Sequence, residues 1–150
     1  MRPNILRFGM NIWPPFLGAG IRVKHIAGDY REIIVSMKLR WYNRNYVGTH
    51  FGGSLAAMTD PFYMLMLIHV LGSDYTVWDK SSTIDFIAPG RGTVTAHFIL
   101  NDDQIAEIKR KALTGEPYFP KFSVDIVNQS GEVIATVAKK LYIRKKQGKE

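Results

Sequence analysis

Residues 55–71 constrain this chain most, because the helix that their pattern predicts carries apolar side chains on every face. A helix without a polar face is stable in water only where the rest of the protein buries it all round. Gly72 then follows, which is typical of a helix C-terminus. The fold must therefore enclose this segment.

The rest of the sequence predicts the strands that enclose this helix. Apolar residues alternate or cluster in six predicted strands, at 20–25, 32–41, 83–88, 93–100, 122–126 and 133–143. Residues 102–113 are amphipathic and predict a surface helix. A short helix over the first dozen residues, stopped by Pro14-Pro15, is expected to cover a sheet edge. The sequence predicts an α+β fold in which an antiparallel sheet of about six strands wraps a long central apolar helix.

The length and composition suit one core. With 150 residues, 46% of them hydrophobic, the chain predicts a single domain over 1–150. Within it we expect a helical extension at 1–18 and a basic tail at 144–150. The start lacks the apolar core and cleavage pattern of a signal peptide. The longest apolar run, 61–71, is shorter than the roughly 20 residues that a membrane span needs. We therefore expect a cytoplasmic protein without a membrane span.

Composition also excludes some chemistry. There is no cysteine, so thiolate nucleophiles, disulfides and cysteine metal clusters are ruled out. His25, His69 and His97 lie far apart in the sequence, and no metal site is expected. The net charge of +7 favours anionic partners, among them nucleic acid, membrane surfaces and phosphate-bearing small molecules. Much of the excess falls between Lys139 and Lys149, where a solvated strand end and frayed terminus is the plainer interpretation.

One stretch, residues 45–60, combines groups that can carry chemistry. Gly52 and Gly53 let a ligand approach the backbone, and N–H groups at the start of the following helix are free to stabilise an oxyanion. Asp60 is the one carboxylate between Glu32 and Asp74 and is expected to be buried among apolar neighbours, as are many catalytic bases and nucleophiles. Asn45 offers an amide that could orient water or a substrate carbonyl. Two further polar side chains lie close by in the sequence, those of His50 and Ser54.

Each of these groups also has a purely structural interpretation. Asp60 followed by Pro61 is a common helix opening, with the acid as the N-cap and the proline in the first turn. Gly52 and Gly53 suit an ordinary tight turn. The residues alone leave both alternatives open.

The same stretch resembles the motif of hotdog-fold thioesterases. In that motif an asparagine, a Gly-Thr pair, a His-Gly-Gly turn and an acid recur at fixed spacing, and the matching residues here are Asn45, Gly48, Thr49, Gly52, Gly53 and Asp60. The resemblance extends to strands at 20–23, 82–89 and 122–142. Phe51 stands where the motif has its histidine, His50 is displaced by one position, and Pro61 follows the acid. The chain looks closer to an uncharacterised thioesterase-like branch than to the phenylacetate-pathway thioesterases.

The resemblance implies a fold, a reaction and roles for residues. It implies a hotdog fold, in which the Gly53 N–H polarises an acyl carbonyl and Asp60 activates water or attacks directly. It implies a site at the interface of a homodimer or a dimer of dimers, with Ser82 and Thr83 reaching it from the partner. Arg91 is then a candidate to pair with coenzyme phosphates. Coenzyme A enters as part of the substrate, and no separate cofactor is expected.

The leading hypothesis is hydrolysis of an acyl-CoA thioester. The alternative is a hotdog protein that binds an acyl group or acyl-CoA without hydrolysing it. Nucleic-acid binding through the basic tail ranks last, because only Tyr142 accompanies those charges as an aromatic.

Overall fold

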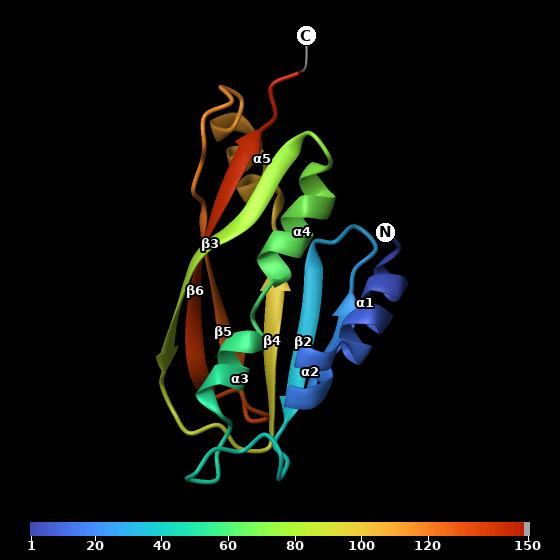
Figure 1. The fold of residues 1–150 in the computed structure, drawn as a ribbon. Coiled ribbons are helices and arrows are strands. Elements are labelled where there is room, and N and C mark those ends of the chain that lie inside the picture. Colours follow the sequence, from blue (N-terminus) through green and yellow to red (C-terminus); the bar gives the residue numbers. More distant parts are fainter. Residues whose placement is uncertain (149–150) are drawn as a thin grey trace.

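The computed structural model describes residues 1–148 and is built on one six-stranded antiparallel sheet (Figure 1). The strand order across the sheet is β1-β2-β4-β5-β6-β3. In chain order the strands are β1 (Ile21–Ile26), β2 (Glu32–Lys38), β3 (Tyr75–Phe86), β4 (Thr93–Ile99), β5 (Lys121–Val127) and β6 (Val133–Lys145). The predicted α+β class and strand number are confirmed, and β1 and β3 are the two edges.

Two short helices precede the sheet, α1 (Pro3–Ile12) and α2 (Pro14–Ala19). Pro14 and Pro15 were expected to end helical structure, but they begin α2, because proline fits the first helical turn, where N–H groups lack partners anyway. α1 covers the edge as predicted. The Asn11 side chain donates to the Val23 carbonyl at 3.0 Å and accepts from the Val23 N–H at 2.8 Å, so it satisfies backbone groups of β1 that no strand pairs.

The central apolar segment is two helices, not the single long helix that we predicted. α3 (Gly52–Ala57) and α4 (Phe62–Leu71) are separated by residues 58–61 (Figure 1). Pro61 accounts for the break, because it has no N–H to donate and its ring clashes with a preceding helical turn. The segment Gly52–Leu71 is long and apolar enough to cross a membrane by length and composition, but half of its apolar stretch is buried inside the fold, as expected of a core helix.

The centre of the core is aromatic. Phe62 is fully buried, with ring centroids of Phe16 at 5.9 Å and Phe98 at 5.1 Å, so it joins α2, α4 and the sheet. The prediction that the helix is buried all round is not met within one chain. Ile68 on α4 is 39% exposed.

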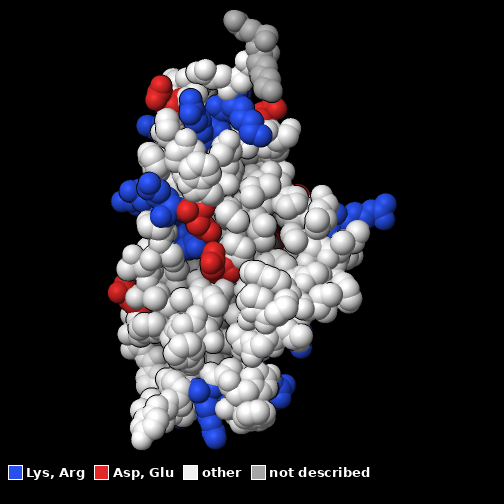
Figure 2. Space-filling view, in the orientation of Figure 1, with Lys and Arg blue, Asp and Glu red and all other residues white. Residues whose placement is uncertain are grey.

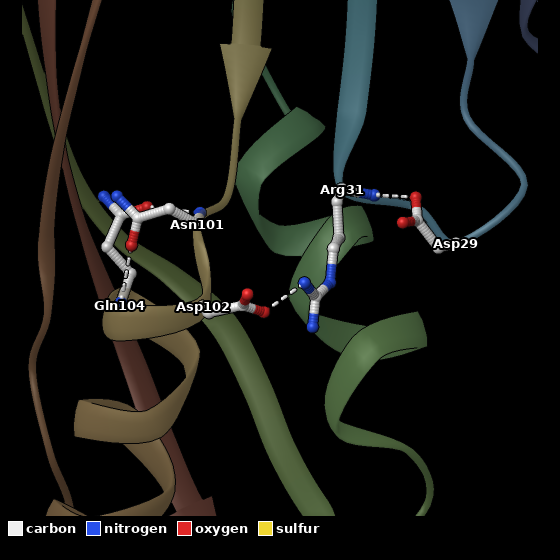
Figure 3. A network of polar contacts seen from close by, with 5 residues as sticks. All are labelled: Asp29, Arg31, Asn101, Asp102 and Gln104. Carbon is white, nitrogen blue, oxygen red and sulfur yellow. Dashed lines mark hydrogen bonds and ion pairs between the residues drawn. The ribbon is translucent and has the colours of Figure 1, made fainter.

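The fifth helix, α5 (Asp102–Lys111), is the amphipathic surface helix that the sequence predicted. Asn101 accepts from the Gln104 N–H at 2.8 Å, and the Gln104 side chain accepts from the Asn101 N–H at 3.0 Å, which forms a capping box (Figure 3). Arg31, beside the β1–β2 turn, pairs with Asp102. These contacts join the β1–β2 hairpin to the start of α5.

The basic tail begins later than predicted. β6 continues to Lys145, where its backbone pairs with Tyr75 of β3, and Lys146 bonds to the carbonyls of Ser73 and Asp74. Lys149 lies outside the described residues.

Candidate functional site

The loop before α3, residues 39–51, is folded by two asparagines. Asn45 accepts from the N–H groups of Val47 and Thr49 and donates to the Thr49 hydroxyl and the His50 carbonyl. These four bonds fill the capacity of a side-chain amide. Asn43, which is buried, accepts from the Arg40 N–H and donates to the carbonyls of Ala19 and Lys38. In this chain both amides therefore hold the loop, and Asn45 has no free group to orient water.

His50 ties this loop to the loop between β3 and β4. Its backbone N–H donates to the Gly90 carbonyl at 2.9 Å, and its Nε2 donates to the Gly92 carbonyl at 2.8 Å. Because a carbonyl only accepts, Nε2 carries the proton and Nδ1 is an acceptor. Nδ1 is buried and has no hydrogen-bond partner within residues 1–148. Burial lowers the pKa of His50 below its ordinary value, and the bond to Gly92 opposes this more weakly.

The two loops and the start of α3 enclose a cleft of about 510 Å³. It contains four of the residues predicted from sequence, namely Asn45, His50, Gly52 and Arg91. The rest of the lining is mainly apolar and includes Val47, Leu55, Phe86, Ile87 and Pro89. This volume and mixture of groups are typical of a small-molecule site.

Neither Gly52 nor Gly53 has a positive φ, so backbone conformation does not require glycine at these positions. Glycine is needed because aromatic rings lie close to both Cα atoms. A Cβ on Gly52 would lie 2.9 Å from the Phe86 ring, and one on Gly53 would lie 2.6 Å from the Phe51 ring. The Phe51 carbonyl accepts from the N–H groups of Ser54 and Leu55. The Gly52 and Gly53 N–H groups precede these first bonds and remain free donors within the described chain. Ser54 itself is buried in α3.

Asp60 lies outside this cleft, in a cluster with Lys139 and Asp79. The Lys139 Nζ is 3.6 Å from Asp60 Oδ1 and 3.3 Å from Asp79 Oδ1. Only 2% of the Lys139 side chain is exposed, against 64% for Asp60 and 23% for Asp79. Figure 2 shows positive and negative side chains meeting beside the break between α3 and α4, on a face that is otherwise largely uncharged.

Two expectations about Asp60 are therefore wrong. It is not buried among apolar residues, because the helix break carries it to the surface. Nor does it cap α4, whose N-cap residue is Pro61 and which has no side-chain cap bond. Lys139, placed in the solvated basic run by the sequence, is instead a buried lysine on the inner face of β6.

A bulge in β3 brings Asp79 to this lysine. Asp79 pairs with Leu141 and Ser81 with Lys140, so Lys80 is an extra residue between them. After the shift, Ser82 pairs with Lys139 and Thr83 with Ala138. Asp79 and Ser82 consequently share the inner face with Lys139, whereas Thr83 projects from the opposite face. Both Ser82 and Thr83 lie well inside β3, not at its start.

Burial and the two neighbouring charges shift the pKa of Asp79 in different directions. Burial raises its pKa above the ordinary value, the Lys139 ammonium opposes this rise, and the Asp60 carboxylate adds to it. Asp79 Oδ1 also lacks an aligned hydrogen-bond donor within residues 1–148, so its contact with Lys139 is an ion pair alone. A buried ammonium is costly without anionic partners, and the two aspartates supply them.

One chain does not bring the glycine turn and Asp60 together. Gly53 is the second residue of α3, whereas Asp60 follows the end of that helix, pairs with Lys139 of β6 and does not line the cleft. An oxyanion donor and a base must both come within about 3 Å of the reacting atoms. The residues predicted from the sequence therefore fall in separate places, with Gly52 in the cleft and Asp60 in the acidic cluster.

A third polar cluster lies on the outer face of the sheet. His97 Nε2 is 2.7 Å from Glu32 and His25 Nε2 is 3.9 Å from it, so residues distant in sequence gather on adjacent strands. Within residues 1–148 no group of three His, Cys, Asp or Glu side chains is arranged to hold a metal ion.

The sequence analysis did not predict that Lys139 and Asp79 cluster with Asp60. The position of Lys139 could have been predicted, because it occupies the same alternating positions as Val137 and Leu141, which face the core. The position of Asp79 could not, since the residue pattern does not reveal the bulge that turns it inward.

The comparisons with known proteins agree on the fold. The family described as "Domain of unknown function (DUF4442)" matches residues 3–143. No sequence among the curated proteins matches this chain at a significant level. Solved structures do match it over nearly the whole length.

Three of these structures are informative. A protein of unknown function from Pseudomonas aeruginosa, described as a probable thioesterase, is 17% identical, with a TM-score of 0.81 over 96% of this chain and 98% of its own. A thioesterase from Haemophilus influenzae is 15% identical, with a TM-score of 0.69 and coverages of 97% and 92%. Mouse thioesterase superfamily member 2 is 19% identical, with a TM-score of 0.65 and coverages of 93% and 96%. The predicted hotdog fold is confirmed.

The lowered pKa of His50 predicts how stability depends on pH. An unfolded histidine takes up a proton near pH 6.5, whereas His50 in the fold does so at lower pH. Below about pH 6.5 the unfolded state binds more protons, so the free energy of unfolding falls as the pH drops through the folded pKa. His50→Gln, which keeps a donor for the Gly92 carbonyl, should lose less stability on acidification.

The measurement is urea unfolding at about pH 7.5 and about pH 5.5 for the wild type and His50→Gln. An unchanged pH dependence in His50→Gln would contradict the assignment.

Proposed function

This chain belongs to the DUF4442 family, and we propose that it hydrolyses an acyl thioester, with acyl-CoA as the substrate class. The observation that carries the proposal is Asp60, a surface carboxylate at the helix break that is held 3.6 Å from a buried lysine. Such a cluster is costly to maintain for stability alone, because buried charges must be desolvated. Perturbed charged clusters of this kind concentrate at catalytic sites.

The chemistry follows from what each group can do. Asp60 is open to solvent, so a water molecule can reach its carboxylate and lose a proton to it while attacking the thioester carbonyl carbon. The oxyanion that forms accepts a hydrogen bond from the Gly53 N–H. Its collapse breaks the C–S bond, and the proton held by Asp60 passes to the leaving thiolate. The products are a carboxylic acid and a thiol.

A second copy of the chain would complete this site. Asp60 does not line the cleft beside the glycine turn of its own chain, and the face carrying α3 and α4 is largely uncharged (Figure 2). On it, Ile68 is exposed, and β3 beside α4 is a sheet edge with no partner strand within the described chain. Unpaired edges and apolar patches of this kind are usually covered. We therefore place the homodimer interface on α4 and β3, with Asp60 and Ser82 of one copy facing the glycine turn of the other.

The cleft would bind the acyl group against its apolar side chains, with Arg91 at its rim for an anionic part of the thiol carrier. This assignment uses the mixed lining of the cleft. It makes coenzyme A a part of the substrate, and no further cofactor is required.

One observation favours the alternative function, binding without hydrolysis. Phe51 occupies the position of the motif histidine, and its ring lies over Gly53, within 2.6 Å of where a Cβ would be. An apolar ring there donates no hydrogen bond to a substrate. If the ring shields the Gly53 N–H, the protein would retain an acyl group and release no thiol.

Replacing Asp60 tests the base directly. Asp60→Asn preserves the shape of the side chain and removes its charge, so thiol release should fall at least about a hundred-fold. The assay measures thiol release from short, medium, long and aromatic acyl-CoAs. Asp103→Asn, a change at an exposed aspartate on α5, is the matched control and should retain wild-type rates. Retained turnover in Asp60→Asn would refute its role, and saturable binding without turnover in the wild type would favour the alternative.

Lys139 should control the charge of the cluster. Lys139→Met removes the cation 3.6 Å from the proposed base, so the charged form of Asp60 loses that stabilisation and the acidic limb of the kcat/KM profile should move to higher pH. Lys140→Met, at the next position on the outer face of β6, removes the same charge and should leave the profile unchanged. The double variant Lys139→Met/Asp79→Asn guards against misfolding, because it leaves no buried carboxylate without its cation. A profile in Lys139→Met that matches Lys140→Met would contradict this role.

The interface proposal predicts that Ile68→Glu dissociates the dimer. A charge on the exposed face of α4 would have to be desolvated on association, so the variant should sediment as a monomer and lose turnover. Phe8→Glu introduces the same charge at an exposed residue of α1, beside the opposite edge of the sheet, and should remain dimeric. Sedimentation velocity measures both. A monomeric wild type, or a dimeric Ile68→Glu, would count against the interface.

A further inference from the structure

A second hollow, of about 540 Å³, lies on β1, β2, β4 and the loop after β2. Four cations line it, and all the other lining residues except Gly20 carry hydroxyl groups. The cations are Arg22, Lys24, Lys38 and Arg40, and the hydroxyl residues are Ser36, Tyr42 and Thr93. No carboxylate is among its lining residues. We call this hollow the basic groove.

The cations of the basic groove have no internal counter-charge. None of the four takes part in an ion pair within residues 1–148, where the carboxylates that are paired bind Arg31, Lys139, His25 and His97. Four positive charges amount to more than half of the net charge of +7. Like charges on neighbouring strands repel one another, so gathering them in one hollow is unfavourable unless an anion binds there.

Strand geometry holds the cations together. Arg22 pairs across the strands with Ser36, and Lys38 pairs with Thr93, so these two cations each lie beside a hydroxyl residue. The Arg22 guanidinium also donates to the Asn11 carbonyl at 2.9 Å, which orients the side chain from α1. The groove is thus built partly on paired strands, and a hydrogen bond holds one of its guanidinium groups.

The basic groove is separate from the acidic cluster. Val23, Val35 and Met37 are buried toward the helices, and the groove residues alternate with them along β1 and β2. Side chains that alternate along a strand project from opposite faces, so the groove lies on the outer face while Asp60 and Lys139 lie on the inner one. A ligand in the groove does not touch the proposed base.

We propose that the basic groove binds the phosphate groups of a nucleotide-sized ligand. Guanidinium and ammonium groups are the side chains that recognise phosphate, and the hydroxyls can donate to further phosphate oxygens. The volume lies within the range of small-molecule sites. Tyr42, at its rim, is half-exposed and packs edge-on against Trp41, which leaves ring surface for a base.

Two features favour a small ligand over a nucleic-acid strand. The cations converge on one hollow, whereas strand binding needs charges along a track with aromatic rings interleaved. Tyr42 is the one aromatic residue that lines the groove. Two small-molecule sources fit the chemistry, the nucleotide end of a coenzyme that carries the acyl group, and a free nucleotide that regulates the protein.

Calorimetry on the full chain at low salt tests the site, with adenosine 3′,5′-bisphosphate, ADP and inorganic pyrophosphate as probes. Lys38→Gln/Arg40→Gln should weaken binding of at least one probe by about ten-fold or more, as expected for lost charge-assisted bonds. Lys109→Gln/Lys111→Gln removes the same charge from exposed positions on α5 and should change affinity by less than about two-fold.

Three outcomes would overturn the proposal. They are the absence of binding by all three probes, an equal loss of affinity in both double variants, and displacement of every probe by a single-stranded oligonucleotide of higher affinity. Because Asp60 lies on the other face, Asp60→Asn should bind the probes like the wild type. Binding therefore tests the groove whether or not the protein hydrolyses thioesters.

Kinetics separate the two sources. If the groove holds the carrier of the substrate, adenosine 3′,5′-bisphosphate should compete with acyl-CoA, and Lys38→Gln/Arg40→Gln should raise KM without changing kcat. If it holds a free nucleotide, the probes should bind with the same affinity in the presence of saturating acyl-CoA. Either result supports a phosphate site.

Discussion

Burial of the apolar residues of α3 and α4 governs the rest of this structure. A helix that is apolar on every face is stable only where other parts of the protein cover it. An antiparallel sheet answers this requirement, because alternate residues on its strands can line one continuous apolar face. Phe62, held between Phe16 and Phe98, shows how α2 and the sheet enclose α4 from two sides. Ile68 on α4 stays exposed in the single chain.

The helix break at Pro61 decides where the Asp60 carboxylate lies. In an unbroken helix residue 60 would continue the buried face, where a carboxylate is costly. The break instead carries Asp60 to the surface while its neighbours Met58 and Phe62 stay in the core. Lys139 then reaches it from the sheet, and the bulge at Lys80 supplies Asp79 as the second anion. The cluster depends on two local irregularities, one in the helix and one in an edge strand.

The sequence predicted the elements that repeat regularly and missed those that depend on irregular backbone. Alternation located β1, β2, β4, β5 and β6, but β3 was placed eight residues too late, because Trp78, Asp79 and Lys80 do not alternate on an edge strand exposed on both faces. Residues close together in the sequence, such as His50 and Gly52, line one cleft. Contacts that require knowledge of strand order, such as Glu32 with His25 and His97, could not be read from spacing. The apolar residues on both sides of Asp60 predicted that it is buried, whereas the helix break before Pro61 leaves its side chain 64% exposed.

The loop of residues 39–51 connects the two faces of the sheet. Arg40 and Tyr42 at its start line the basic groove, and Asn45 and His50 near its end line the cleft. The Gly92 carbonyl accepts from both the Leu39 N–H, at 2.9 Å, and His50 Nε2, at 2.8 Å, so the two ends of the loop are fixed to one atom. Asn43 and Asn45 hold the chain between them. The His50 and asparagine bonds are part-buried, and together with the Leu39 bond they hold a wall of the cleft and a wall of the groove. The geometry of the cleft and of the groove therefore rests on the same few hydrogen bonds.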